Sequence, residues 1–501
     1  MRGNQSTPEG LAARTVKGSV YSITASGVTL VLGLGRSIVM ARLLAPEDFG
    51  IVAFALVFLS LTTPLRDFGL DLALIHRRTD EKSSLNQALA VHFFLRCALM
   101  GLFVLLLLAA VPILHFLYPQ RTLLVPVLLA LTVGELAGAL SATPITYLRK
   151  EMRFKELAAL QVLTSLSMTI VGPLMAWAGF GLWAIVAERI SGVMVATFVV
   201  WVFIRPWRLC WEFDWGMVKW YLGYGKFVFA TRSLTQVLDQ FDDFWVGTAL
   251  GAQNLGFYSK AYEYANYPRR AVSDPIVQVL FPVFAKVQND RQRLSKAFSQ
   301  ISSLVVRVGF LLAGGLVLGA PELITFLLGA KWTPMTPVFQ LMVVYTLLSP
   351  LLSISGNLVN AVGHPEYTAN ARVAQTILFV PAVILSARWG GINGVALAAD
   401  VTLVLGLVLL LHQSRRVVDV SYRAVLLLPS LALLAGASLG WGFGAWLSGN
   451  ALVAFVGRMV GFFLGYNLLL VLFERQQYLS QFRVIFEALS GRQCPSSQPT
   501  S

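Results

Sequence analysis

Charged side chains interrupt an apolar stretch, residues 221–250, that is long enough to cross a bilayer as a helix. Stepping round a helix places four polar side chains on one narrow face, at spacings i, i+4, i+7 and i+11: Arg232, Gln236, Asp239 and Asp243. Each charge at mid-bilayer costs about 2.5–3.5 kcal/mol on insertion scales. Two interpretations explain this face. It lines a watery cavity inside the protein, or its charges form ion pairs that hold helices together.

The next apolar stretch, residues 256–285, mixes charged residues with tyrosines: Tyr258, Lys260, Tyr262, Glu263, Tyr264, Tyr267, Arg269, Arg270 and Asp274. Guanidinium groups match phosphate oxygens in geometry and charge. The sequence therefore predicts a substrate site for a phosphate or pyrophosphate group, formed by Arg36, Arg232, Gln236, Tyr262, Arg269 and Arg270. The tyrosines either stack on sugars or pack at the lipid interface.

Intramembrane carboxylates often bind a coupling cation or a proton. Five acidic residues are candidates for that role or for gating: Asp239, Asp242, Asp243, Glu263 and Asp274. Three arginines elsewhere at depth are instead expected to snorkel or to pair structurally: Arg66, Arg372 and Arg458.

The composition predicts an all-α integral membrane protein. Of 501 residues, 56% are hydrophobic and only 13% are charged, with a mean hydropathy of +0.69, whereas a soluble domain is typically about 25% charged. The net charge of +14 would suggest a nucleic-acid partner in a soluble protein. Here basic loops account for most of it, so we expect no nucleic-acid partner.

Several kinds of chemistry have no motif in the sequence. The three cysteines, Cys97, Cys210 and Cys494, have no metal-ligand spacing. There is no Walker A loop. We therefore expect a protein that is not an enzyme and that needs no cofactor beyond a coupling proton or Na⁺.

Membrane helices need about 20 apolar residues, and the chain contains about fourteen such stretches. The first is too long for a signal-peptide core. Prolines are expected to interrupt several spans: Pro64, Pro112, Pro268, Pro275 and Pro350. The predicted spans lie near residues 18–43, 49–75, 86–117, 122–147, 157–178, 181–204, 221–250, 256–285, 299–328, 336–361, 368–387, 391–412, 424–447 and 451–473.

Basic residues predict the orientation. The N-terminal tail and nearly all connections that follow an even-numbered span (the second, fourth, sixth and so on) carry basic clusters, such as Arg149, Lys150, Arg153 and Lys155 after the fourth span. The alternate connections, which follow the odd-numbered spans, carry few basic residues: Arg42, Arg121, Lys331 and Arg388. The connection at 364–366 is the exception. The positive-inside rule then places both termini in the cytoplasm. The alternate connections are short, which leaves no room for a folded domain outside the membrane.

The chain also repeats itself. A shift of 206 residues aligns Ala41-Arg-Leu-Leu-Ala-Pro-Glu-Asp-Phe-Gly50 with Gly247-Thr-Ala-Leu-Gly-Ala-Gln-Asn-Leu-Gly256, and lays the polar face of the first span on that of the seventh. A shift by six spans predicts two parallel six-helix lobes around a central cavity, plus two extra helices. The predicted divisions are a lobe at 1–206, an interfacial linker at 207–220, a lobe at 221–412, two extra spans at 413–474 and a cytoplasmic tail at 475–501. The tryptophans of the linker suit either a helix in the headgroup layer or a plain aromatic belt.

Two segments carry a family resemblance. The stretch from Ala41 to Ile51, followed by Asp67-Phe-Gly-Leu-Asp71, resembles bacterial polysaccharide flippases of the multidrug/oligosaccharidyl-lipid/polysaccharide exporter superfamily. The run from Asp239 through Tyr262 is similar to the same group, especially its lipopolysaccharide, exopolysaccharide and colanic-acid exporters. The resemblance implies a transporter in the bacterial inner membrane that moves a polyprenyl-pyrophosphate-linked oligosaccharide between leaflets. It implies membrane lipids as surroundings, and a polysaccharide polymerase or export machinery as possible partners.

Two other classes stay open at this point. A drug/cation antiporter shares the superfamily architecture but would favour an acidic or aromatic cavity. A membrane polysaccharide polymerase or ligase would need a reaction centre on a long outer loop, and the outer loops here are short.

Overall fold

The computed structural model describes residues 8–77, 82–207, 212–447 and 451–490, and in these ranges every regular element is helical. The helices are α1 (Pro8–Leu43), α2 (Pro46–Leu61), α3 (Thr63–Asp67), α4 (Leu70–His76), α5 (Lys82–Leu117), α6 (Leu124–Lys150), α7 (Phe154–Trp177), α8 (Leu182–Phe198), η1 (Val199–Ile204), α9 (Trp215–Trp245), η2 (Val246–Leu250), α10 (Ala252–Ala265), η3 (Arg269–Ser273), α11 (Asp274–Val287), α12 (Arg291–Leu327), η4 (Ala330–Met335), α13 (Thr336–Ala361), α14 (Pro365–Ser414), α15 (Tyr422–Trp446) and α16 (Ala451–Ser490).

These helices confirm the predicted all-α membrane architecture. Within the described residues, ten helices are long and apolar enough to span a membrane, or eleven if the bent pair Pro46–Leu61 and Thr63–His76 is one span. Helices lie over all fourteen predicted ranges. The lower count arises because α14 joins two predicted spans across a kink at Gly391, and because the charged α9 and α10–α11 are not among the ten.

Two of the predicted proline breaks are wrong. Pro112 and Pro350 lie inside the continuous helices α5 and α13. Membrane helices tolerate such prolines because neighbouring groups satisfy the freed carbonyls. Pro64 does stand in the first turn of α3, just after α2 ends, and Pro268 directly precedes the wide turn η3.

The chain forms two compact units. Unit 1 comprises residues 1–260, 327–334 and 383–395, and unit 2 comprises residues 261–326, 335–382 and 396–501. The predicted lobes and linker stay a prediction. Of the linker, residues 208–211 lie outside the described residues, and Trp215 already begins α9, where the Asp214 carboxylate accepts from the Gly216 and Met217 amides at 2.9 and 3.1 Å.

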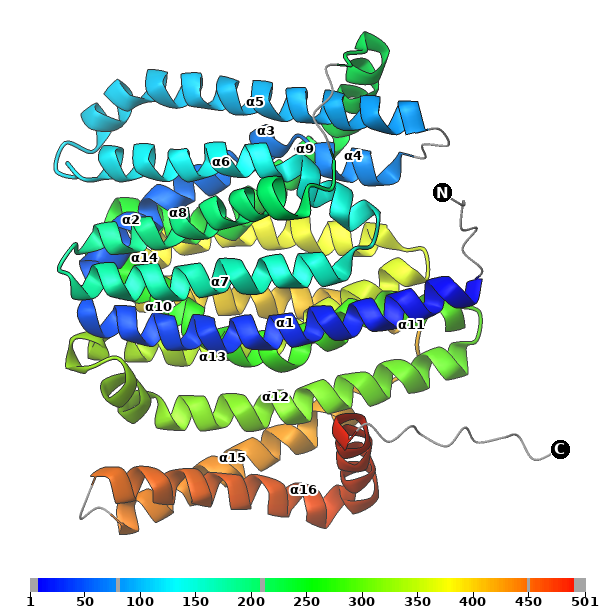
Figure 1. Ribbon diagram of the computed structural model, residues 1–501. Coiled ribbons are helices and arrows are strands. Elements are labelled where there is room, and N and C mark those ends of the chain that lie inside the picture. The colour runs from blue at the N-terminus through cyan, green and yellow to red at the C-terminus, as the bar shows by residue number, and fades with distance from the viewer. Residues whose placement is uncertain (1–7, 78–81, 208–211, 448–450, 491–501) are drawn as a thin grey trace. The chain divides into compact units, whose positions relative to one another are not determined.

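In unit 1, α1 lies along α7, which also packs on α8 (Figure 1). The closest helix crossing joins α2 to α10. A Cβ on Gly50 would lie 1.7 Å from the Ala252 carbonyl oxygen, and one on Gly256 would lie 1.9 Å from the Pro46 carbonyl oxygen. The contact is reciprocal and obeys the 206-residue shift, since Pro46 aligns with Ala252 as Gly50 does with Gly256. Glycine is required on both sides because any side chain would collide with backbone.

A break in the second span gives unit 1 its most irregular segment. Phe68 and Gly69 separate α3 from α4 and both adopt left-handed backbone conformations, with φ of 44° and 69°. Helix α9 packs directly on this break: a Cβ on Gly225 would lie 2.2 Å from the Phe68 carbonyl oxygen. The break therefore fixes the position of the two carboxylates that flank it, Asp67 and Asp71, relative to α9.

In unit 2, α15 and α16 form a closely packed pair (Figure 1). Glycines at four-residue intervals line the contact, for example Gly436 and Gly440 on α15 against Gly461 and Gly465 on α16. Small residues allow membrane helices to approach closely, where dispersion forces replace the hydrophobic effect as the source of association. Helix α12 joins this pair through Gly314, which faces the ring of Phe462.

Candidate functional site

Charged side chains gather around the break between α3 and α4. Arg232 of α9 forms an ion pair with Asp67, the last residue of α3. Arg96 of α5 binds the same carboxylate, with its Nη1 2.7 Å from Asp67 Oδ1, and its Nη2 lies 3.8 Å from Asp71 Oδ2. One carboxylate thus serves two arginines on different helices. These residues belong to a larger set that we call the unit 1 charge network: Arg66, Asp67, Asp71, His92, Arg96, Glu135 and Arg232.

The network continues toward α6. Arg66 pairs with Glu135 of α6 and donates to the Leu59 carbonyl oxygen at 2.6 Å. Its guanidinium also lies 5.0 Å from the centre of the Phe103 ring. This confirms the predicted structural pairing of Arg66. The same holds for Arg458, which pairs with Glu322 at 2.9 Å in unit 2, whereas Arg372 is exposed.

His92 belongs to the network and was missed in the sequence. Its ring is fully buried, with Nδ1 2.8 Å from the Thr143 hydroxyl and Nε2 3.2 Å from Asp71 Oδ1. A signal was present: His92 and Arg96 lie four residues apart, on one face of an otherwise apolar span. The aspartate partner lies on another helix, so no local pattern could have assigned it.

The polar face of α9 lies partly within this environment. The exposed fraction of the Arg232 side chain is 43%, against 8% for Asp67 and 18% for Arg96. Both interpretations of the face therefore apply to Arg232, which joins two helices and still has a partly exposed side chain. Gln236 is half-buried and Asp239 is exposed.

Of the remaining aspartates of α9, Asp242 contacts a neighbouring helix. Asp242 accepts a hydrogen bond from the Tyr258 hydroxyl at 2.8 Å, and Asp243 is half-buried. Tyr258 itself is only 1% exposed. Packing, rather than stacking on a sugar, therefore accounts for this tyrosine. Gln240 accepts from the Ser60 hydroxyl at 2.8 Å, which ties α9 to α2.

Arg36 lies in a different part of unit 1. Its Nε is 2.9 Å from Glu188 Oε1 on α8. Gly172 of α7 makes room for this carboxylate, since a Cβ there would lie 3.1 Å from the Glu188 side chain. Arg36 lines a groove of about 600 Å³ together with Arg149, Gln161 and residues of α7. Arg36 and Arg232 thus have separate carboxylate partners.

The predicted site residues of unit 2 surround the wide turn η3. Arg269 Nε lies 3.5 Å from Asp274 Oδ1, and Arg269 Nη1 lies 3.4 Å from the Ser349 hydroxyl. Arg270 is exposed, and Glu263 is half-buried. The Tyr262 ring lies 6.2 Å from that of Tyr345.

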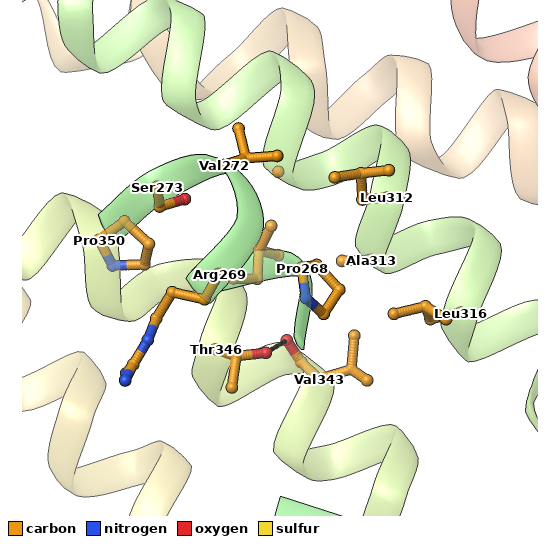
Figure 2. A pocket seen from close by; sticks show the side chains of 12 residues that line it. Pro268, Arg269, Val272, Ser273, Leu312, Ala313, Leu316, Val343, Thr346 and Pro350 are labelled. Carbon is orange, nitrogen blue, oxygen red and sulfur yellow. Dashed lines mark hydrogen bonds between the residues drawn. The ribbon is translucent and has the colours of Figure 1, made fainter. Parts of the chain in front are cut away.

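Beside η3 is a small apolar cavity of about 20 Å³, the space of one water molecule. Figure 2 shows the Arg269 guanidinium directed away from Leu312 and Leu316, which line this cavity. The cavity therefore does not hold the charge of Arg269. The predicted cleft that would unite the arginines of α1, α9 and η3 includes residues of both units and stays a prediction.

Both units are built from membrane-length helices, and they carry ion pairs at depths where lipid alone would not tolerate charge. That is the class of a multi-pass membrane protein with polar internal surfaces. Residues 39–337, more than half of the chain, match the family model described as "Polysaccharide biosynthesis protein". The chain belongs to this family.

Three known proteins illustrate the relationship. The chain is 27% identical over 395 residues to the lipopolysaccharide biosynthesis protein WzxC of Escherichia coli (strain K12), covering 77% of this chain and 78% of that protein. The fold matches that of lipid II flippase MurJ in an inward closed conformation, with a TM-score of 0.71, 17% identity, and coverage of 91% of this chain and 99% of that one. It also matches an inward-facing multidrug resistance MATE family transporter of the MOP superfamily, with a TM-score of 0.64, 14% identity, and coverage of 80% and 98%. The resemblance inferred from the sequence motifs is confirmed.

Proposed function

We propose that this protein is a flippase that moves a polyprenyl-pyrophosphate-linked oligosaccharide from the cytoplasmic to the outer leaflet of the bacterial inner membrane, for export of a surface polysaccharide. Family membership, similarity to WzxC and the fold shared with MurJ support this function. The observation that carries it is Arg232, an arginine on a membrane-length helix whose charge is already balanced by a carboxylate and whose side chain is still 43% exposed. Such a group can accept a phosphate without first becoming an unpaired buried charge.

The mechanism follows from the strength of guanidinium–phosphate contacts. A forked guanidinium forms two parallel hydrogen bonds with phosphate oxygens, and charge-assisted bonds of this kind contribute about 1.5–3 kcal/mol each. The pyrophosphate would replace Asp67 as the partner of Arg232, with Arg36, Arg269 and Arg270 as further cationic groups. The polyprenyl tail would stay in lipid while the lobes rock about the headgroup. Binding of a proton or Na⁺ at the carboxylates of α9 to α11 would bias one state over the other.

The drug/cation antiporter remains the second candidate, because the MATE fold is shared at a TM-score of 0.64. A cavity for cationic drugs needs unpaired negative charge or aromatic faces. In the described residues around Arg232, the carboxylates of Asp67 and Asp71 are instead paired with arginine and histidine. That pairing favours an anionic substrate. A polysaccharide polymerase or ligase is a weaker candidate, and we propose a transporter without enzymatic activity, with both termini in the cytoplasm and with the polymerase or export machinery as partners.

The test is complementation of a deletion strain. The strain should accumulate a lipid-linked oligosaccharide and lose its surface polymer. Wild-type protein and Arg293→Ala should restore export, because Arg293 is 79% exposed on the first turn of α12. Arg232→Ala should lower export on the order of 100-fold at an unchanged amount in the membrane, as expected for the loss of one to two charge-assisted hydrogen bonds. Arg232→Lys, which keeps the charge and loses the fork, should fall between them.

Two outcomes would contradict the proposal. Normal export by Arg232→Ala would remove this arginine from the substrate site. Unchanged lipid-linked pools in the deletion strain, together with a new drug sensitivity, would favour the antiporter.

A further inference from the structure

A buried histidine in unit 1 has an unusual pair of neighbours. The His92 ring has no exposed surface, and its two nitrogens face Thr143 of α6 and Asp71 of α4 at 2.8 and 3.2 Å. Both Nε2 and Asp71 Oδ1 are buried and face each other at that distance. A buried pair of this kind is costly unless a proton lies between the two atoms. This pair is therefore a candidate for a function beyond packing.

The arrangement determines where protons can lie. A bare imidazole nitrogen and a carboxylate oxygen repel each other, so a proton must stand between Nε2 and Oδ1. In neutral His92 that proton is on Nε2, and Nδ1 then accepts from the Thr143 hydroxyl. A second proton can bind at Nδ1 if the Thr143 hydroxyl rotates to act as acceptor, donating instead to a carbonyl of its own helix. The site can thus take up one proton without movement of the backbone.

Charged and aromatic groups face His92 from several helices. Asp71 faces the ring from α4, Arg96 lies on its own helix, Asp67 reaches Arg96 from α3, and Tyr221 of α9 has its ring centre 6.0 Å away. The Tyr221 hydroxyl is occupied, since it donates to the Ala88 carbonyl oxygen at 3.1 Å.

Counted over the whole network, three arginines balance three carboxylates: Arg66, Arg96, Arg232, Asp67, Asp71 and Glu135. Among these arginines Arg232 is the most exposed, at 43% of its side chain against 10% for Arg66 and 18% for Arg96. Departure of Arg232 would leave one net negative charge in a poorly hydrated region.

We propose that His92 and Asp71 form a proton-binding site linked to Arg232, so that His92 takes up one proton when Arg232 exchanges Asp67 for a pyrophosphate group. The proton restores neutrality to the network. It reaches His92 from water through Asp71, whose side chain is 22% exposed. Asp67 tolerates the exchange because Arg96 remains bound to it at 2.7 Å. Linkage is reciprocal, so a protonated His92 in turn favours the state in which Arg232 holds the headgroup.

This inference rests on the proposed function, since it takes a pyrophosphate as the group that Arg232 binds. The experiment uses full-length protein in lipid nanodiscs and farnesyl pyrophosphate as the probe. Binding heats measured near pH 7 in buffers of different ionisation enthalpy give the number of protons taken up per probe bound. Pyrophosphate itself titrates near neutral pH, so the readout is the difference between wild type and H92Q.

Wild type should take up about one proton more per bound probe than H92Q. D71N, which removes the charged partner by a different route, should lose the same uptake, and it serves as the test if H92Q does not fold. The matched control is H364Q. His364 also pairs with a carboxylate, Glu366 at 2.8 Å, but at an exposed site of unit 2, so H364Q should behave as wild type.

Equal proton uptake by wild type and H92Q, with the probe bound to both, would overturn the inference and leave the proposed function intact. No binding of the probe to wild type would overturn pyrophosphate recognition, and the linkage with it. A second measurement is ring NMR of the five histidines, with the His92 signal assigned by its loss in H92Q. That signal should change from neutral to charged imidazole on addition of the probe, and a neutral ring in the bound state would overturn the linkage.

Discussion

The ion pairs at the break between α3 and α4 in unit 1 and those between α12 and α16 in unit 2 are organised differently. In the unit 1 charge network Asp67 serves both Arg96 and Arg232, and Asp71 serves Arg96 and His92. In unit 2 the described ion pairs between α12 and α16 join one arginine to one carboxylate, Arg307 to Glu474 and Arg458 to Glu322. Sharing allows one member to leave while the other keeps its partner. Opening the Arg458–Glu322 pair would instead take from Glu322 the arginine that binds it.

The difference separates structural pairs from a site that can exchange partners. The Arg307 side chain is 3% exposed. Its ion pair joins α12 to α16 at Glu474, the residue at which α16 is kinked. The Tyr466 hydroxyl donates to the Arg307 carbonyl oxygen at 2.8 Å, which adds a second tie between the same helices. We therefore expect the unit 2 pairs to determine stability, and the unit 1 network to determine transport.

The largest loss of stability is expected from substitution of Arg307. Arg307→Ala leaves the Glu474 carboxylate without its partner and should destabilise the protein by about 3–5 kcal/mol, as breaking a buried pair typically does. Thermal denaturation in detergent measures the loss. The double variant R307L/E474L removes both charges and should recover most of it, because a well-packed apolar pair is often as stable as the buried ion pair it replaces. A double variant no more stable than R307A would show that the pair acts through something other than its charge.

The second prediction tests whether Asp67 is a shared partner of Arg96 and Arg232. Asp67→Asn removes the common partner of Arg96 and Arg232 and should cost about 1.5–3 kcal/mol, less than R307A. The loss is limited because Arg96 keeps Asp71 at 3.8 Å and Arg232 can be hydrated at its exposed surface. Export should fall as well, since Arg232 loses its positioning partner. The comparison would fail if D67N destabilised the protein more than R307A, because Asp67 would then be a structural residue.

The sequence predicted the polar face of α9 and the helices on which most of these groups lie. Periodicity was sufficient because a membrane helix places residues at i, i+4 and i+7 on one side whatever surrounds it. The 206-residue shift also aligned Gly50 with Gly256 as equivalent positions of the two repeats. That the two glycines meet at the α2–α10 crossing is seen only in the structure. Their close approach needs small residues on both helices.

Partners could not be predicted in the same way. Asp67 meets Arg232 because α9 packs on the break at Phe68 and Gly69, a tertiary contact with no local signature. His92 was overlooked for the same reason, since its carboxylate lies on α4 and its hydroxyl on α6. Proline positions were also insufficient, because whether a proline interrupts a membrane helix depends on the groups packed around it.

The third prediction concerns an ion pair of unit 2 that is only partly buried. Arg458 and Glu322 are 18% and 28% exposed, and the Arg458 guanidinium also lies 5.5 Å from the centre of the Trp441 ring. Arg458→Ala should cost about 1–2 kcal/mol, since partial hydration of Glu322 offsets part of the loss. Arg458→Lys keeps the charge and serves as the control. A loss as large as that of R307A would mean that burial does not set the order among the unit 2 pairs.

The smallest effect concerns the exposed pair of Arg291 and Asp419, which joins the start of α12 to the connection before α15 through two contacts of 2.7 Å. The hydrogen bonds from Arg291 hold the pKa of Asp419 below its ordinary value. A carboxyl group with a lowered pKa in the folded state stabilises the protein above its unfolded pKa, about 3.9, and the contribution is lost as the pH falls through the folded value. The melting temperature of wild type should therefore be slightly higher than that of D419N at pH 7, and salt should reduce the difference. Below about pH 4 that difference should shrink toward zero. A difference in melting temperature between wild type and D419N that persisted in acid would show that the aspartate acts through packing. The pair would then no longer serve as the most exposed of the unit 2 ion pairs compared by their charge.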